Sequence, residues 1–304
     1  MKIIVNAKSV PKTEEFLAKV NAGFKNIEIQ LLEKEVTKQQ YEDTDKIIKD
    51  YGVDIRVVHS PILRPPIVDK ITDIVLIKLL DRTFFDTLID TCKYAEHIAE
   101  LENHRVKIVV HNDMSEYMWK LTNLIETSIG PKIKDITDFF SNIDFVIENT
   151  STVEDRGFNT IFGMSDIAYV VHELNKFAPG RIMPLMDTCH MMMSYESWKR
   201  VAYEDLTDWK KEFKDATQYG DLGLIHLNNM RDNGIDADHS RPFSIDEIDD
   251  IKKLKEIMKN YRKYSKCEIT IEVNEDDYTA TPVNLLKTKE ALETIGFKLI
   301  TEKQ

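Results

Sequence analysis

Seven side chains that could bind a metal ion stand at or just after the ends of short apolar runs. The runs are RVVH, KIVVH, FVIE, IMPLMD followed by TCH, GLIH and ITIE, and the side chains are His59, His111, Glu148, Asp187, His190, His226 and Glu272. A buried strand has little use for a carboxylate or an imidazole except at its end, because burying an unpaired polar group costs free energy. Several such ends gathered at one face of a barrel would make a metal site.

Four of these residues close consecutive runs and form one predicted site: Glu148, Asp187, His226 and Glu272. Three carboxylates and one imidazole form an oxygen-rich set that suits Mn²⁺, Mg²⁺, Co²⁺ or Zn²⁺. Such a site can polarise a carbonyl or activate water. A single residue of this kind is more often bonded to loop backbone, but four in consecutive strands favour a shared metal.

Two histidines close earlier runs and predict a second site. His59 in VVHSP and His111 in VVHND stand at equivalent strand ends, and beside Glu148 they would make a softer, more zinc-like set. His190 follows Asp187 by three residues, so both side chains can share one helical turn and face one pocket. We expect His190 to bind a third metal or a substrate hydroxyl.

The segment after the seventh strand carries further candidates. His239 in DADHS is a candidate ligand, with Asp238 or Asp236 beside it. Arg231 and Arg241 on the same loop are candidates for contact with a phosphate of the substrate.

Asn149 directly follows Glu148 and is a further candidate for binding the substrate.

The elements that must position these residues alternate between strand and helix. Candidate strands are Lys2–Asn6, Asn26–Leu31, Asp54–His59, Val106–His111, Ile143–Glu148, Arg181–Asp187, Leu222–Leu227 and Glu268–Val273. Most are continuous apolar runs, which is typical of a parallel sheet covered on both faces. Eight strand–helix units in 304 residues predict a (β/α)8 TIM barrel, with residues 1–304 as a single domain.

Several helix boundaries can also be predicted. Capping boxes are expected at Thr37–Gln40 and Ser244–Glu247, and Thr281–Pro282 is typical of an N-cap followed by proline at the first helical position. Gly296 should end the last helix. The longest helical stretch is expected from about Ile71 to Glu102, as two helices or as one helix with a break.

Composition limits the class of protein. The formal net charge is −12, which disfavours a protein that coats nucleic acid, although three bound divalent cations would offset part of it. The three cysteines form no CxxC pair, so reduced thiols are expected. With no signal-peptide pattern and no long apolar run, the sequence predicts a cytoplasmic protein without a membrane partner. No protein partner is inferred.

The motifs resemble the endonuclease IV family, metal-dependent apurinic/apyrimidinic endonucleases within the xylose isomerase-like TIM barrel superfamily. The strings that carry the resemblance are LMDTCH (185–190), IENT (147–150), IHLNN (225–229), VVHSP and VVHND. The resemblance implies a three-zinc centre. It assigns one metal to His59, His111 and Glu148, a second to Glu148, Asp187, His226 and Glu272, and a third to His190 and His239 with a nearby Asp such as Asp238.

Two functions stay open on this sequence. The first is phosphodiester hydrolysis on damaged DNA with two to three Zn²⁺, where Glu148 would bridge two metals and position the nucleophile. The second is a sugar or polyol isomerase or epimerase with one Mn²⁺, Mg²⁺ or other divalent ion. In that case Glu148 and Glu272 would move a proton between carbons of a small sugar substrate. The number of candidate ligands favours the hydrolase, because a one-metal isomerase needs only four of them.

Overall fold

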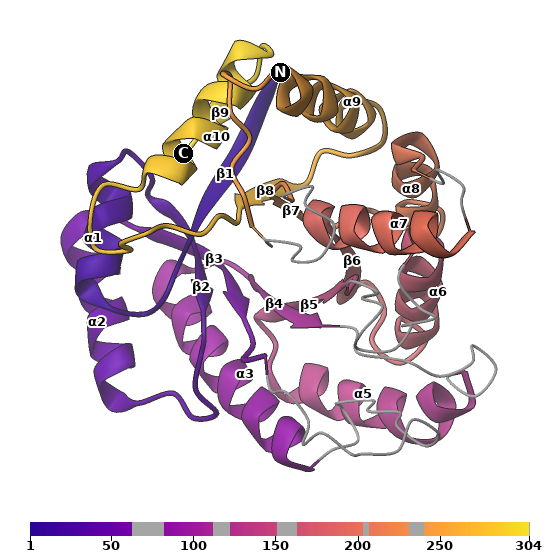
Figure 1. The fold of residues 1–304 in the computed structure, drawn as a ribbon. Coiled ribbons are helices and arrows are strands. Elements are labelled where there is room, and N and C mark those ends of the chain that lie inside the picture. The colour runs from indigo at the N-terminus through magenta and orange to yellow at the C-terminus, as the bar shows by residue number, and fades with distance from the viewer. Residues whose placement is uncertain (63–81, 112–121, 151–162, 203–206, 231–239, 304) are drawn as a thin grey trace.

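Eight parallel strands close into a barrel inside a ring of helices (Figure 1). The structure is a computed structural model that describes residues 1–62, 82–111, 122–150, 163–202, 207–230 and 240–303. The barrel strands are β1 Lys2–Ser9, β2 Asn26–Gln30, β3 Asp54–His59, β4 Val106–His111, β5 Ile143–Glu148, β6 Ile182–Asp187, β7 Leu224–Leu227 and β8 Glu268–Ile271. Each strand pairs with the next along the chain, and β1 pairs with both β8 and β2, which closes the barrel. The predicted fold class is therefore confirmed.

The first strand is longer than predicted and has an additional partner. Its beginning pairs with a ninth strand, β9 Lys298–Ile300, which the sequence analysis did not predict. Its end, from Ala7 to Ser9, pairs with Ile27 to Ile29 of β2. The predicted end of this strand at Asn6 is therefore wrong by three residues, because pairing with β2 continues to Ser9. As a result Lys8 lies inside the barrel sheet.

Helices cover the outside of the sheet. The described α-helices are α1 Thr13–Asn21, α2 Lys38–Tyr51, α3 Arg82–Glu102, α5 Gly130–Phe139, α6 Met164–Leu174, α7 Thr188–Ala202, α8 Trp209–Ala216, α9 Ile248–Tyr264 and α10 Val283–Thr294, and a π-helical turn at Ile125–Ile129 precedes α5. Their apolar faces pack on the strands through fully buried side chains such as Phe16, Ile47, Tyr94 and Phe213. Burial of a side chain of this size contributes roughly 1.5–3 kcal/mol to stability. Among the described residues, no helix is long and apolar enough to cross a membrane.

A small apolar layer fills the middle of the barrel, and the candidate ligands lie in the next layer toward the carboxyl ends of the strands. The layer consists of Val57, Val109, Val146, Leu185 and Leu224, one from each of five consecutive strands. Side chains alternate between the two faces of a strand, so the residue two positions later points inward again, one layer nearer the carboxyl end. Those next residues are His59, His111, Glu148, Asp187 and His226. The alternation of the strands therefore brings the candidate ligands together above a dry layer.

Two predicted helix boundaries are confirmed. The Thr37 hydroxyl accepts a hydrogen bond from the Gln40 amide while the Gln40 side chain accepts one from the Thr37 amide, which completes the capping box of α2. Gly296 follows α10 with φ at 90°, a left-handed conformation that glycine adopts without steric strain. Most of the predicted long helix is also present as α3, whereas residues 71–81 lie outside the described residues.

Two other boundaries differ from the prediction. The capping box at Ser244–Glu247 does not form, because the Ser244 hydroxyl accepts from the Asp246 amide and α9 begins only at Ile248. The last helix begins one residue later than expected, with Pro282 at the N-cap and Val283 as the first helical residue. At Ser244 a local turn thus uses the hydroxyl that was expected to start the helix.

An ion pair at the amino end of the barrel gives stability that depends on pH. The His104 ring lies with Nε2 at 2.7 Å from Oδ1 of the fully buried Asp54. The hydrogen bond to Asp54 raises the pKa of His104 above 6.5, although partial burial opposes the shift. A raised pKa stabilises the fold most below the unfolded value, and this contribution is lost as pH rises through the folded pKa.

We therefore predict that His104→Gln destabilises the protein by about 1 kcal/mol at about pH 5.5 and by clearly less at about pH 8.5. Urea unfolding at the two pH values measures the difference. An equal loss at both pH values would contradict the proposed charge on His104.

Candidate metal centre

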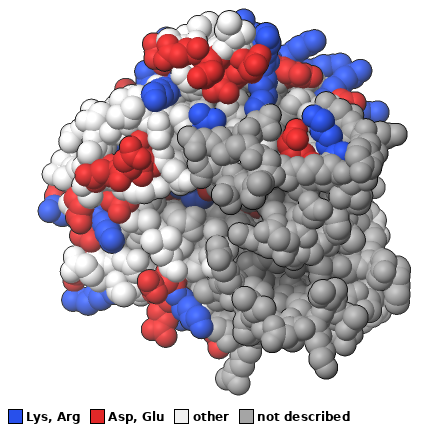
Figure 2. All heavy atoms as spheres, in the orientation of Figure 1, with Lys and Arg blue, Asp and Glu red and all other residues white. Residues whose placement is uncertain are grey.

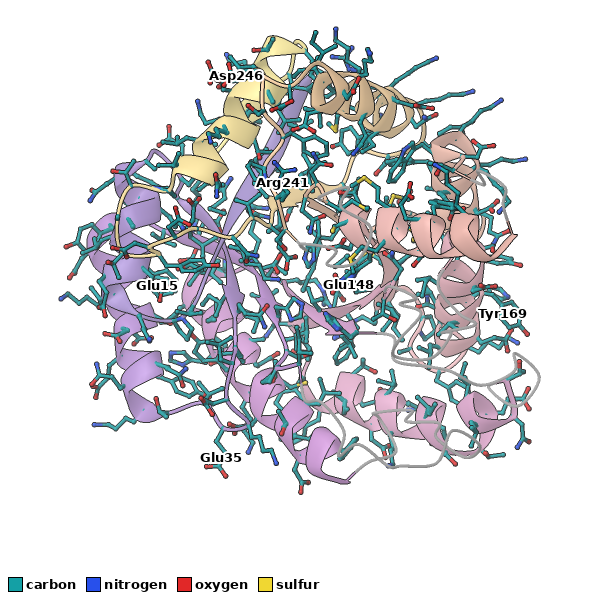
Figure 3. All side chains as sticks on the ribbon, viewed as in Figure 1. Glu15, Glu35, Glu148, Tyr169, Arg241 and Asp246 are labelled. Carbon is teal, nitrogen blue, oxygen red and sulfur yellow. The ribbon has the colours of Figure 1, made fainter. Side chains whose placement is uncertain are left out.

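Six of the seven strand-end side chains form two groups that share one residue. His59, His111 and Glu148 form what we call the histidine group, and Glu148, Asp187, His226 and Glu272 form the carboxylate group. Within each group one potential ligand atom per residue lies within 4.8 Å of the others. Figure 3 shows Glu148 within the ring of strands, whereas Glu15, Glu35, Tyr169 and Asp246 lie at the periphery. The structure thus brings these residues together as the sequence predicts, and their binding of metal stays a prediction.

Glu148 offers one carboxylate oxygen to each group. Its Oε2 atom lies 2.9 Å from Nε2 of His111 and 3.4 Å from Nε2 of His59. Its Oε1 atom lies 3.1 Å from Nδ1 of His226. The carboxylate is 1% exposed, so solvent water does not take the place of these partners. This arrangement allows Glu148 to bridge two cations.

The tautomer of His59 fits a metal ligand. Its Nδ1–H donates a hydrogen bond to the Ser60 carbonyl at 2.7 Å. Burial, with the positive charge of Lys8 as a second cause, lowers the pKa of His59 to about 4, so the ring is neutral near pH 7. Its Nε2 atom then carries a lone pair and faces the Glu148 carboxylate at 3.4 Å. Two electron-rich atoms at this distance repel each other unless a cation lies between them.

Two carboxylate oxygens in the site have short contacts without hydrogen bonds. Oε2 of Glu148 and Oε2 of Glu272 are buried and have no hydrogen-bond partner. Nevertheless each has a histidine nitrogen nearby, His111 at 2.9 Å and His226 at 2.8 Å. A hydrogen bond needs alignment as well as distance, so these nitrogens and oxygens do not point at one another. Donor atoms that converge on a common point are what a metal ion requires, and the residues present therefore fit a divalent cation.

The electrostatics of the site favour cations. Burial acts to raise the pKa of Glu148, but His111 and His226 lower it well below its usual value. Burial likewise opposes the lowered pKa of Glu272, which Lys8 and His226 cause. The buried carboxylates in turn raise the pKa of His226 well above 6.5, against the effect of burial. The carboxylates are thus held ionised, and metal binding would have to release the proton from His226.

Asp187 both belongs to the carboxylate group and starts a helix. Its Oδ1 atom accepts a hydrogen bond from the His190 amide at 2.7 Å, in the first turn of α7. Its Oδ2 atom accepts from Nδ2 of Asn228 at 3.0 Å. The string LMDTCH therefore folds as a strand end that caps the following helix, and this capping fixes the orientation of the carboxylate.

His190 lies beside both groups but belongs to neither. Its Nδ1–H donates to the Asn149 carbonyl at 2.8 Å, and Nδ1 lies 3.5 Å from Oε1 of Glu148. Asp187, Glu148 and Glu272 raise its pKa, although burial opposes them. Asp236, Asp238, His239 and Arg231 lie outside the described residues, so the third predicted metal site stays a prediction.

The two other predicted substrate-binding residues have different surroundings. The Asn149 side chain is fully buried, with Oδ1 accepting from the Asp187 amide at 2.7 Å and Nδ2 donating to the Asp187 carbonyl at 3.2 Å. These bonds tie the end of β5 to β6, which favours a positioning role over the predicted contact with substrate. Arg241 exchanges backbone hydrogen bonds with Asn229 after β7, and its side chain is partly exposed.

Two charged residues that border the site were not predicted from the sequence. Lys8 on β1 lies with Nζ at 2.7 Å from Oε1 of Glu272 and 3.6 Å from Oε1 of Glu28. Glu28 on β2 is fully buried and contacts Nε2 of His226 at 3.1 Å. A signal was present in the string NIEIQ, where a charged residue interrupts an apolar strand. Lys8 was missed because the first strand was expected to end before it.

Comparisons with known proteins establish the fold. No family model and no curated protein sequence matches this chain. The structure is similar to 3-keto-D-glucoside 4-epimerase YcjR from E. coli, with a TM-score of 0.57, 12% identity and coverage of 96% of this chain and 98% of that one. SacUVDE has a TM-score of 0.58 at 11% identity and coverage of 96% and 99%. The IolI protein with a binding zinc atom has 0.56 at 11%, with coverage of 96% and 97%.

This chain has the (β/α)8 TIM barrel fold. Identities this low carry the fold alone, and the resemblance to endonuclease IV stays a prediction.

We predict different zinc losses for two substitutions in the site. Glu148→Gln should remove most bound zinc, because both groups lose a ligand, whereas Glu272→Gln should weaken only the carboxylate group. Elemental analysis of protein purified without chelator measures zinc per chain, with about two expected for the wild type.

Glu268→Gln is the matched control, because Glu268 also lies inside the barrel but at its amino end, where it pairs with Arg56 at 3.1 Å. This variant should keep its zinc. A full zinc complement in Glu148→Gln would contradict a shared ligand.

Proposed function

We propose that this chain is a divalent-metal-dependent enzyme that hydrolyses phosphodiester bonds in damaged DNA. The observation that carries the proposal is the position of Glu148, with one oxygen toward the histidine group and the other toward the carboxylate group. Two adjacent cations suit phosphoryl transfer, because they stabilise both the attacking and the leaving oxygen of an in-line displacement. A one-metal sugar isomerase would have no use for His59 and His111 at this position.

The side chains divide into buried and reachable members. His59, Glu148 and His226 are at most 1% exposed, whereas the side chains of His111 and Glu272 are 12% and 16% exposed. A substrate would thus approach from the side of His111 and Glu272. Glu148 would stay buried behind these two side chains, as the residue that both groups share. When bound, the cations would supply Lewis-acid polarisation of a phosphoryl oxygen and acidify a water molecule.

A candidate site inside the end of a barrel can be reached only by a nucleotide that is turned out of the duplex, and this favours damaged DNA as the substrate. A nucleotide at an abasic or damaged position is poorly stacked, so turning it out of the duplex costs less free energy than turning out a normal one. Over the described part of the surface that faces the viewer in Figure 2, basic and acidic side chains are interspersed. Affinity for the DNA backbone would then come from the cations in the site and from phosphate contacts of Arg241 and Arg231.

The proposal is tested with a duplex that contains one abasic site. Protein loaded with Zn²⁺ or Mn²⁺ should cut the strand at that site, and His59→Ala should lower kcat by roughly 100-fold or more, because the histidine group loses a ligand. His97→Ala is the matched control, since His97 pairs with Asp45 at 2.7 Å between α2 and α3 and should leave the rate unchanged. Failure of the metal-loaded wild type to cut either this duplex or bis-4-nitrophenyl phosphate would overturn the proposal.

One observation favours a second candidate, a sugar epimerase or isomerase. The carboxylate group is by itself a four-ligand site, and Glu148 and Glu272 lie 3.1 Å and 2.8 Å from the same nitrogen of His226. A single metal there could bind adjacent oxygens of a sugar while the two glutamates move a proton. The candidates differ at His59, because an epimerase should keep its activity on ketohexoses in His59→Ala.

A further inference from the structure

A buried salt-bridge network lies directly behind the carboxylate group and joins four strands. Glu28 on β2 receives a hydrogen bond from the Thr270 hydroxyl of β8 at 2.7 Å and contacts Nε2 of His226 on β7 at 3.1 Å, both through its Oε2 atom. Lys8 on β1 contacts Oε1 of Glu28 at 3.6 Å and Oε1 of Glu272 at 2.7 Å. Two charged side chains from the first two strands thus hold two members of the candidate metal centre.

Glu28 determines which nitrogen of His226 faces the site. A carboxylate accepts hydrogen bonds and does not donate them, so Nε2 of His226 carries its proton toward Glu28. Nδ1 lies 3.1 Å from Glu148 and 2.8 Å from Glu272, on the side of the site, so it is the nitrogen that would release its proton and offer a lone pair to a metal ion. A carboxylate behind a histidine in this way fixes the ring and makes the opposite nitrogen a stronger ligand.

Lys8 acts on Glu272 in a different way. Its ammonium group holds the Oε1 atom of Glu272, and the other oxygen faces His226. Only one oxygen of Glu272 would therefore be available to a metal ion. An ammonium group this close repels a cation, so its presence does not serve metal affinity. A metal ion that receives one oxygen from Glu272 in place of two would have more room to bind a substrate oxygen.

We propose that Glu28 and Lys8 are positioning residues of opposite effect, Glu28 strengthening metal binding through His226 and Lys8 weakening it to keep a coordination position open on the side of Glu272. The inference rests on the proposed metal centre and deepens it. It does not depend on whether the substrate is a phosphodiester or a sugar.

The test uses Co²⁺ binding to the full chain, measured by competition with a chelator and by the visible absorption of the bound ion. Glu28→Gln should bind Co²⁺ roughly 10- to 100-fold more weakly than the wild type. Lys8→Met should bind it roughly 3- to 10-fold more tightly. In Lys8→Met the absorption should also weaken, because Glu272 can then add its second oxygen and raise the coordination number.

The opposite signs separate this inference from a purely structural role, which would weaken binding in both variants. Lys107→Met and Glu268→Gln serve as matched controls, because these residues form a 3.6 Å pair inside the barrel at its other end. Both controls should bind Co²⁺ as the wild type does. Lys8→Met also decides the question if Glu28→Gln does not fold.

Two results would overturn the inference, and they have different meanings. Wild-type affinity in Glu28→Gln, or weaker binding in Lys8→Met, would refute the roles of these residues while the metal centre stands. A wild-type protein that binds no Co²⁺ would refute the metal centre together with this inference.

Discussion

A buried carboxylate shared by the histidine group and the carboxylate group is the constraint on which the rest of the site depends. Glu148 is ionised and 1% exposed, so its charge must be balanced by protein groups or by bound cations. The barrel makes this possible because its inward positions repeat every second residue. The valine and leucine layer below Glu148 excludes water, and the next inward residues of neighbouring strands supply nitrogen and oxygen atoms around it. Fold and site are therefore linked through the alternation of five strands.

Much of this arrangement could be predicted from the sequence because strand ends carry the information. Apolar runs that stop at His59, His111, Glu148 and His226 indicate both where a strand ends and what lies at its end. Parallel strands in a barrel then bring those ends to one face, whatever the separation along the chain. For this reason residues as distant as His59 and Glu272 could be assigned to one site without knowledge of the packing.

Other features of the site and the fold depend on contacts between distant residues, which cannot be predicted from the sequence pattern. Lys8 and Glu28 lie within strands, and only the pairing of β1 with β2 and the contacts across the barrel bring them to His226 and Glu272. The ninth strand has three residues, too few for a pattern to emerge. The two hydrogen bonds of the Asn149 side chain to the Asp187 backbone likewise depend on the pairing of β5 with β6, while its contact with substrate stays a prediction.

The most direct test of a bridging Glu148 is anomalous X-ray diffraction from crystals grown with Zn²⁺ and measured at the zinc absorption edge. If Glu148 bridges two metal ions, we expect two anomalous peaks, one at each of its oxygens, with the first near His59 and His111 and the second near His226 and Glu272. A single peak at the carboxylate group, with no density near His59 and His111, would contradict the shared ligand and favour a one-metal enzyme on the same barrel.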